Sequence, residues 1–398
     1  MKRSTDRILM SHAGSLHRPD DLRETMASRR DDEPIDDALA ARIKDAVKEV
    51  VKLQAENGVD VVNDGEYTKR SWQTYSRGRL SGLEQRPLRE GEDPNYGSIT
   101  ARESKYFPDF FARGLAPFGA GRPASANAAG GGFAQQAVFC VGPLQYIGQK
   151  EVQRDIDYIK EAAKGVNVEE LCLTALAPAT IEHWMRNQHY NTQEDMLFAI
   201  ADAMHEEYKA ITDAGITLQI DDPDLPDGYH VYPEMSIAEY RKFAEVRVEA
   251  INRSLRGIPE ELVRLHICWG SIHHPHTQDI PLKDIIDLVF AVKAQCYSIE
   301  AANPQHEHEW NVFENVKLPD GKILMPGVLG HCAPEFVEHP ELVAQRLLRY
   351  ANLVGRENVI GGTDCGLQRV RTASIQWAKF RAGAEGARIA TKKLWGRN

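Results

Sequence analysis

The stretch RLHICWG, at residues 264–270, decides the fold, because it has the form of a buried strand that runs into a polar loop. Many of the strand-like runs in this sequence are continuous rather than alternating, which is typical of parallel strands covered on both faces. Eight other stretches have a similar form. They are Arg7–Ser15, Val59–Glu66, Ala137–Pro143, Glu170–Pro178, Ile216–Pro223, Cys296–Ala302, Ile323–His331 and Asn358–Cys365.

Longer segments with apolar residues at helical spacing separate these runs. Asp37–Asn57 stops at Gly58, and Thr192–Ala214 begins with a threonine suited to cap a helix. Four further helices are predicted over Ser236–Ser254, Pro281–Ala294, Pro340–Leu353 and Thr372–Leu394. Repeated strand–helix units imply a parallel sheet with right-handed crossovers. About eight such units close most economically into a (β/α)₈ barrel of the TIM type, in the α/β class.

Nine candidate strands compete for eight places in this barrel, and Ala137–Pro143 is the one we expect to be accessory. We predict one catalytic domain over residues 1–398, with a long excursion after the second strand. The excursion covers residues 68–136, includes the Gly- and Ala-rich run Ala124–Ala134, and is expected to lie over the barrel mouth. An open doubly wound sheet is the alternative, but no GxGxxG fingerprint follows the first strand.

Composition narrows the classes of function. The 398 residues carry a formal net charge of −10, which argues against nucleic acid as a partner, because binding it requires a basic patch. The N-terminal segment has only a three-residue apolar run, Ile8–Met10, too short for a signal peptide or a membrane span. Six widely and irregularly spaced cysteines do not form a disulfide framework. We therefore expect a cytoplasmic protein that does not bind membranes.

Side chains with metal-binding chemistry occur where the predicted strands end. His266 and Cys268 are two residues apart on one strand, so they point to the same face. Glu300 lies near the end of the next strand, and Cys365 lies at the end of the last one. Because the carboxyl ends of barrel strands face one mouth, these four side chains can converge. Two thiolates, an imidazole and a carboxylate form a ligand set that suits Zn²⁺.

Each of these residues also has a plainer interpretation. A buried cysteine is usually an inert small side chain, and periodicity does not by itself select Cys365 over Cys296 or Cys332. A zinc ion with four protein ligands is usually structural. Such a site could still be catalytic if a ligand such as Glu300 leaves when a substrate thiol binds.

The sequence resembles the cobalamin-independent methionine synthase family, specifically its C-terminal catalytic barrel. The resemblance is carried, in order, by AGSLHRP at 13–19, VVNDGE at 61–66, LQIDDPDLPDG at 218–228, HICWG at 266–270, SIEAAN at 298–303, PGVLGH at 326–331 and TDCGL at 363–367. It covers most of the chain. It implies a TIM-type barrel in which zinc, held by His266, Cys268, Glu300 and Cys365, activates a thiol that attacks an alkyl carbon.

The resemblance also implies roles for residues outside the ligand set. Ser15 matches the position that holds the amino-acid carboxylate, and Glu66 and Asp221 match the acids that hold the ammonium group. Trp184 lies where the family stacks a pterin ring, and His331 matches a histidine that assists proton transfer. From the residues alone, Trp184 could equally be a packing residue, and Ser15 could simply end a strand in a turn.

We predict a zinc-dependent enzyme that transfers a methyl or other alkyl group to a thiol, with homocysteine or a related thiol as acceptor. The donor would be of the methyl-tetrahydrofolate or methylcorrinoid type. The chain lacks the second, N-terminal barrel of the full synthase, and NPQHEHEW at 303–310 departs from the synthase motif. The alternative is an epoxyalkane:coenzyme M transferase-like enzyme, which would need a cationic site for a sulfonate, drawn from Arg186, Arg369 or Arg371. A metal-free decarboxylase-like barrel and a non-catalytic zinc protein are further alternatives; the sequence does not indicate an oligomeric state.

Overall fold

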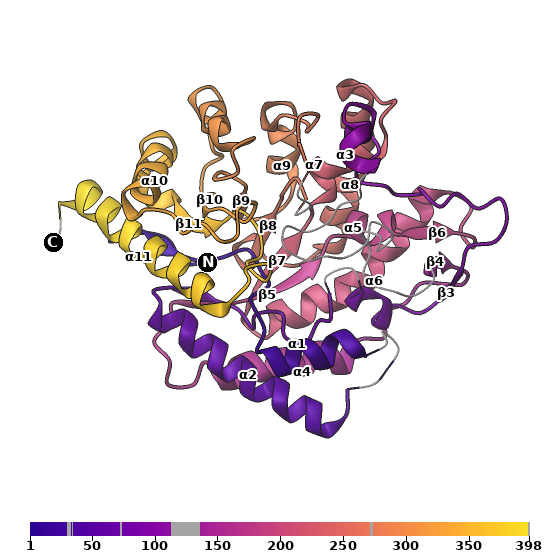
Figure 1. Cartoon of the computed structure of the whole chain (residues 1–398), viewed down its shortest axis with the longest axis horizontal. Helices are drawn as coiled ribbons and strands as arrows, with labels where there is room; N and C mark the ends of the chain where they lie inside the picture. The colour runs from indigo at the N-terminus through magenta and orange to yellow at the C-terminus, as the bar shows by residue number, and fades with distance from the viewer. Residues whose placement is uncertain (30–32, 34, 72–73, 113–135, 271–273, 397–398) are drawn as a thin grey trace.

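Eight parallel strands form the barrel, and helices surround it (Figure 1). The computed structural model describes residues 1–29, 33, 35–71, 74–112, 136–270 and 274–396. The barrel strands are β1 (Leu9–Met10), β2 (Val61–Val62), β5 (Glu170–Leu176), β7 (Thr217–Asp221), β8 (Val263–His266), β9 (Cys296–Ile299), β10 (Ile323–Leu329) and β11 (Ile360–Thr363).

The strand order is β1-β11-β10-β9-β8-β7-β5-β2, and every pair in this order is parallel. The ring is nearly closed between its first and last strands, because the Asp60 N–H donates to the Met10 carbonyl at 2.8 Å. This confirms the TIM-type barrel. The accessory status of Ala137–Pro143 is also confirmed, since that segment forms no part of the ring.

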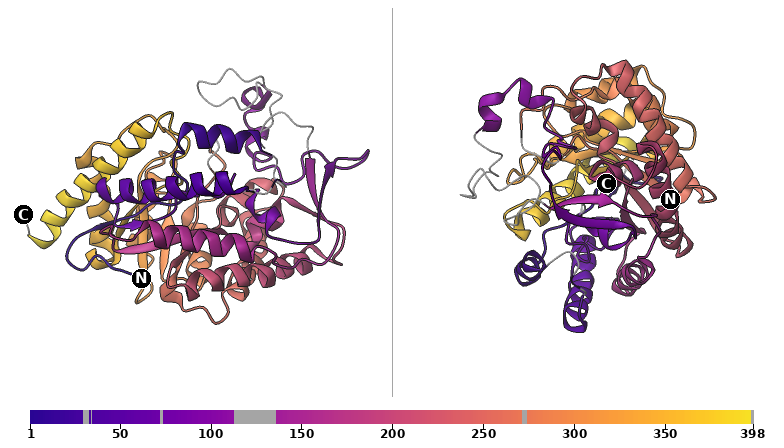
Figure 2. Two further views of the ribbon diagram at one scale, coloured as in Figure 1. Left: turned by 90° about the horizontal axis from the view of Figure 1, so that it is seen from below. Right: turned by 90° about the vertical axis from the view of Figure 1, so that its right-hand side faces the viewer.

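A second, three-stranded sheet stands beside the barrel. It has the order β3-β4-β6, with β3 (Leu83–Pro87) antiparallel and β6 (Met185–Asn187) parallel to β4 (Gln136–Cys140). It lies at the end of the molecule opposite the C-terminal helix α11 (Ala373–Trp395), as Figure 1 and the left view of Figure 2 show. Part of the predicted excursion therefore pairs into a sheet. Its Gly- and Ala-rich run lies outside the described residues.

Helices follow most barrel strands and surround the ring (Figure 1). They are α1 (Asp20–Ser28), α2 (Asp37–Glu56), α4 (Gln149–Ala162), α6 (Gln193–Asp213), α8 (Ile237–Ser254), α9 (Ile286–Ala291), α10 (Pro340–Val354) and α11. Their ends follow the expected chemistry: Thr192 caps α6 in a reciprocal capping box with Asp195. None of the helices in the described ranges has the length and apolar character needed to cross a membrane.

One predicted helix is wrong. Residues 281–294 form a short 3₁₀ turn, η4 (Leu282–Asp284), and then the six-residue α9. The backbone leaves the helical conformation at Ile285, with φ of −131°, and again at Val292, with ψ of 132°. Short helices α3 (Pro108–Ala112), α5 (Pro178–His183) and α7 (Asp224–Val231) lie in the connections.

Candidate metal centre

Three of the four predicted metal ligands meet at the mouth of the barrel. His266 ends β8, Cys268 follows two residues later, and Cys365 follows β11. Their ligand atoms all lie within 4.8 Å of one another. The Cys268 and Cys365 sulfurs are 4.0 Å apart, although the residues are separated by 97 positions in the sequence. The barrel topology thus brings together side chains that are distant in the sequence. Their positions at the strand ends predicted this convergence.

The donor set and its surroundings fit a tetrahedral zinc ion. Zn–S bonds of about 2.3 Å at the tetrahedral angle place two sulfurs about 3.8 Å apart, close to the separation found here. Nδ1 of His266 lies 3.0 Å from the Ser298 hydroxyl, which fixes the ring. Nε2 of His266 is buried and has no hydrogen-bond partner among the described residues. A buried ring nitrogen facing two thiols is the arrangement that a metal would satisfy.

Electrostatics favour one thiolate already in the protein alone. The pKa of Cys365 is held well below its usual value, first by a hydrogen bond with Cys268 and then by His266 and His331. The pKa of Cys268 is raised well above its usual value by the same sulfur contact, by burial and by the nearby Glu300. The two sulfurs therefore share one proton, and removing that proton as well is unfavourable.

The fourth predicted ligand, Glu300, lies beside the thiols in an adjacent group. Its ligand atom lies within 4.8 Å of those of His331 and Asp364. The carboxylate accepts from the Trp269 N–H at 3.2 Å and from the Asn303 amide at 2.9 Å. Burial, followed by the charge of Asp364, raises the pKa of Glu300 well above its usual value. Glu300 is thus a buried carboxyl group next to the three-ligand cluster.

Asp364, the residue directly before Cys365, is the third member of this group. Its carboxylate accepts the backbone N–H groups of Ala301 and Ala302 at 2.8 and 2.9 Å, and burial raises its pKa to about 7. It thereby ties the end of β11 to the loop that carries Glu300. The feature of the sequence that could have pointed to Asp364 is its position at a strand end, directly before a predicted ligand.

The two predicted ammonium-binding acids lie on neighbouring parts of the same mouth. Glu66 is buried in a left-handed backbone conformation, with φ of 60°, and accepts from the Thr174 hydroxyl at 3.0 Å. Asp221 ends β7 and accepts from the Gln219 amide at 2.6 Å. Burial is the largest cause of the rise in the pKa of Asp221 to about 7, and the charge of Glu66 adds to it. The two carboxylates are therefore close enough to influence each other.

Ser15 packs against the loop that carries Cys365. The Leu367 N–H donates to the Ser15 carbonyl at 2.8 Å. A β-carbon placed on Gly366 would lie only 2.4 Å from the Ser15 hydroxyl oxygen, so glycine is required there by close approach. The structure thus places Ser15 next to the candidate metal centre.

Trp184 caps the end of α5 and stacks on His183, with ring centroids 4.4 Å apart and planes inclined by 9°. His183 in turn contacts the Asp224 carboxylate and lies 2.6 Å from the Gly97 carbonyl. Trp184 also lines a small hollow with Val138, Leu176, Thr180 and other residues. Its indole is therefore anchored on one face by an imidazole.

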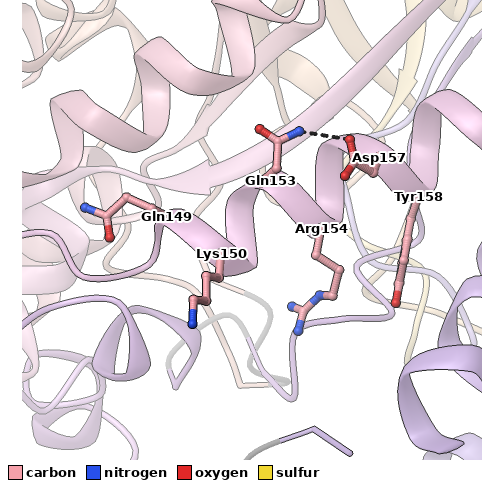
Figure 3. A pocket seen from close by; sticks show the side chains of 6 residues that line it. All are labelled: Gln149, Lys150, Gln153, Arg154, Asp157 and Tyr158. Atoms are coloured by element: carbon pink, nitrogen blue, oxygen red, sulfur yellow. Dashed lines mark hydrogen bonds between the residues drawn. The ribbon is translucent and has the colours of Figure 1, made fainter. Parts of the chain in front are cut away.

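A shallow hollow elsewhere lies along helix α4 (Figure 3). It is lined by Gln149, Lys150, Gln153, Arg154, Asp157 and Tyr158. None of the predicted site residues belongs to it, so it gives no support to a second catalytic site.

Comparison with known proteins agrees with the site. The sequence profile of the catalytic domain of cobalamin-independent synthases matches residues 147–385, which is more than half of the chain and includes all four predicted ligands. The chain belongs to this family. The matched residues 147–385 begin before β5 and extend into α11, so the match covers six of the eight barrel strands.

The relatives of this chain include proteins named methionine synthase. The chain is 26% identical to the methionine synthase of Sulfolobus acidocaldarius over 275 residues, which are 68% of this chain and 65% of that protein. It is 24% identical to that of Thermococcus kodakarensis over 356 residues, covering 88% and 84% of the two chains. The structure is similar to that of a B12-independent methionine synthase from a Shewanella species in complex with selenomethionine, with a TM-score of 0.70, 18% identity, and coverage of 98% and 100%. At this identity the structural likeness establishes the fold.

Proposed function

We propose that this chain is a zinc-dependent enzyme that transfers a methyl group to the thiol of homocysteine. The observation that carries the proposal is the convergence of His266, Cys268 and Cys365 within 4.8 Å at the barrel mouth of a cobalamin-independent synthase. Two relatives that bear the name methionine synthase support the choice of reaction. Because thiol ligands must stay reduced, we place the enzyme in the cytoplasm.

His266, Cys268 and Cys365 would hold the zinc, and Glu300 would complete the set or leave it when a substrate arrives. Bound there, Zn²⁺ would lower the pKa of an acceptor thiol so that it reacts as a thiolate at neutral pH. Ser298 keeps the coordinating nitrogen of His266 aimed at the site, through its contact with the other ring nitrogen.

Glu66 and Asp221 would bind the ammonium group of the acceptor. Both carboxylates accept hydrogen bonds from neutral groups, Thr174 and Gln219, so their charge is not cancelled by those partners. The hydroxyl of Ser15, next to the Cys365 loop, would receive the acceptor's carboxylate. Holding both the ammonium and the carboxylate group of the acceptor fixes the direction of its thiol. Such positioning can raise the effective concentration of a reacting group to ~10⁵ M or more.

The donor would be a methyl-tetrahydrofolate-type or methylcorrinoid compound. Trp184, held flat against His183, offers an aromatic face for a pterin ring. His331, buried next to Glu300, would supply a proton to the leaving group. Both roles are proposals drawn from placement.

A second candidate function, opening of an epoxide by a thiol sulfonate, is favoured by one observation. Arg369 interacts electrostatically with both Cys365 and Cys268, so a cation lies near the thiols. The other two arginines considered are engaged elsewhere: Arg186 donates to the Asp93 carbonyl, and Arg371 lies 3.2 Å from the Glu335 carboxylate. Arg369 would then be the residue that binds the sulfonate.

Steady-state transfer assays separate the two functions. The zinc-loaded enzyme is given methyl-tetrahydrofolate, a methylcorrinoid or an epoxyalkane, each with homocysteine, coenzyme M or glutathione. We expect methionine from homocysteine with one of the methyl donors. Product only from epoxyalkane and coenzyme M would replace the first proposal by the second, and no product with any pair would contradict both.

A further inference from the structure

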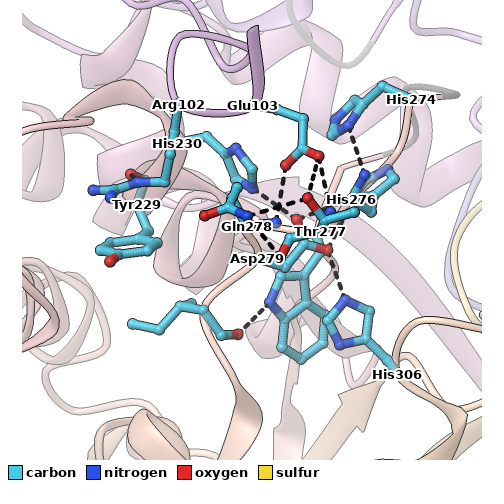
Figure 4. A network of polar contacts seen from close by, with 12 residues as sticks. Arg102, Glu103, Tyr229, His230, His274, His276, Thr277, Gln278, Asp279 and His306 are labelled. Atoms are coloured by element: carbon cyan, nitrogen blue, oxygen red, sulfur yellow. Dashed lines mark hydrogen bonds and ion pairs between the residues drawn. The ribbon is translucent and has the colours of Figure 1, made fainter. Parts of the chain in front are cut away.

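Buried charged side chains gather around Asp279, next to the candidate metal centre (Figure 4). The Asp279 carboxylate contacts His230 Nε2 at 2.7 Å, His276 Nδ1 at 3.0 Å and His306 Nε2 at 2.8 Å. Its side chain is only 1% exposed. These residues, with Glu309, are called the Asp279 cluster below.

The geometry at His306 fixes its charge. Nε2 faces Asp279, and Nδ1 faces Glu309 at 2.8 Å. A carboxylate accepts hydrogen bonds but does not donate, so both ring nitrogens carry a proton and the ring is an imidazolium. Burial alone would lower the pKa of His306, but the two carboxylates raise it to about 10.

This imidazolium stacks on the indole of Trp269, with ring centroids 3.8 Å apart and planes inclined by 20°. The indole is fully buried, and its Nε1–H donates to the Ile280 carbonyl at 2.8 Å. A cation over an indole face is an attractive arrangement in a desolvated site. The ring of Trp269 is thus held by its face and by its edge.

The backbone of the same residue reaches the metal centre. Trp269 follows the predicted ligand Cys268 directly, and its N–H donates to Glu300 at 3.2 Å. The peptide between Cys268 and Trp269 therefore touches two predicted ligands. Because the buried ring and this peptide share one Cα, a displacement of Trp269 as a whole would move the peptide and with it both predicted ligands.

The other side of the Asp279 cluster is anchored by the excursion. The Glu103 carboxylate accepts the Thr277 N–H, the Thr277 hydroxyl and the Gln278 N–H at 2.8–2.9 Å (Figure 4). Arg102 donates to the Tyr229 carbonyl at 3.0 Å, next to His230. The loop that carries Asp279 is thereby fixed by contacts distant from the metal centre.

We propose that His306 and Asp279 are positioning residues for the metal ligands, acting through the ring and the backbone amide of Trp269. The inference rests on the proposed function, because Glu300 and Cys268 need exact placement only if they bind a metal. Partners that orient ligands from outside the coordination shell typically change metal affinity roughly 10- to 100-fold when removed.

The test compares His306→Gln and Asp279→Asn with His308→Gln in the full-length protein. His308 is exposed on the same segment and is the matched control. Zinc affinity is measured by competition with a chromophoric chelator, the coordination shell by zinc-edge absorption, and folding by thermal unfolding. We expect both cluster variants to bind zinc roughly 10- to 100-fold more weakly, with an altered oxygen contribution, and the control to match the parent.

The outcomes distinguish a failure of the proposed zinc function from a failure of the positioning role alone. If His306→Gln does not fold, Asp279→Asn carries the test, because it keeps the shape of the side chain and removes its charge. A parent protein that binds no zinc would contradict the proposed function. A parent that binds zinc, with folded cluster variants whose affinity and absorption spectrum equal the parent's, would overturn only the positioning role, even if their melting temperatures were lower.

Discussion

Asp221 and His266 are directly paired in the register of β7 and β8, so a predicted substrate-binding acid and a predicted metal ligand occupy the same level of the barrel. Burial raises the pKa of Asp221 to about 7, and the nearby His266 opposes that rise. An acceptor whose ammonium group lies against Asp221 would therefore have its thiol within reach of the metal centre. This relationship supports the proposal of an amino-acid thiol as acceptor.

Removing either acid should weaken binding of the amino-acid acceptor without removing the metal. For Asp221→Asn and Glu66→Gln we expect KM for homocysteine to rise by about 10- to 100-fold, since a charged hydrogen bond contributes about 1.5–3 kcal/mol. Zinc content should stay at the parent level. Coenzyme M, which has no ammonium group, is the internal control. Equal losses with both thiols would contradict the assignment.

Replacing Cys365 with Ser should remove zinc and activity together, because one of the two thiolate ligands is lost. Cys332→Ser is the matched control, since Cys332 is half-buried, follows His331 and lies outside the three-ligand cluster. Zinc per protein after dialysis measures both. Full zinc occupancy in Cys365→Ser would show that the ligand is wrongly assigned.

A methyl group on Gly366 should displace the Cys365 loop. The added carbon would lie 2.4 Å from the Ser15 hydroxyl oxygen and 3.0 Å from its backbone nitrogen. We expect Gly366→Ala to reduce the free energy of unfolding by about 1–3 kcal/mol and to weaken zinc binding. Gly78→Ala is the control, because no atom lies within 4 Å of the added carbon. If denaturant melts show the same stability for both variants, the close approach of Ser15 and Gly366 is not a constraint.

The His183–Asp224 contact should make stability depend on pH. Burial opposes the charge on His183, but Asp224 and the Gly97 carbonyl raise its pKa to about 9, above the value near 6.5 of an unfolded histidine. The stabilisation is therefore complete below pH 6.5 and disappears as the pH rises to about 9. Relative to His183→Gln, the parent should lose roughly 3 kcal/mol of unfolding free energy across this window. Parallel pH profiles of the two proteins would contradict the raised pKa.

The barrel was predictable because buried parallel strands leave continuous apolar runs, and eight of the nine runs became barrel strands. The ninth, Ala137–Pro143, pairs with Leu83–Pro87 in the side sheet, a long-range choice that local pattern does not reveal. The predicted helix at Pro281–Ala294 is wrong in extent, because the backbone leaves the helical conformation at Ile285 and at Val292.

The candidate site, like the fold, has parts that follow from local sequence pattern and parts that depend on long-range contacts. His266, Cys268 and Cys365 could be predicted, because they stand at strand ends and a barrel gathers strand ends. The Asp279 cluster could not, because its members come from α7, from the loop with His276 and Asp279, and from the start of the 3₁₀ helix η5 (Glu307–Glu314), and only their contacts show that they meet. Sequence spacing carries no information about such contacts.

The central claim is that a zinc ion at this mouth takes up the acceptor's sulfur. Zinc-edge absorption of the purified protein, with and without homocysteine, tests it most directly. We predict two sulfur ligands in the free protein, from Cys268 and Cys365, and three after homocysteine is added. A protein without zinc, or a coordination shell that homocysteine and coenzyme M both leave unchanged, would contradict the account.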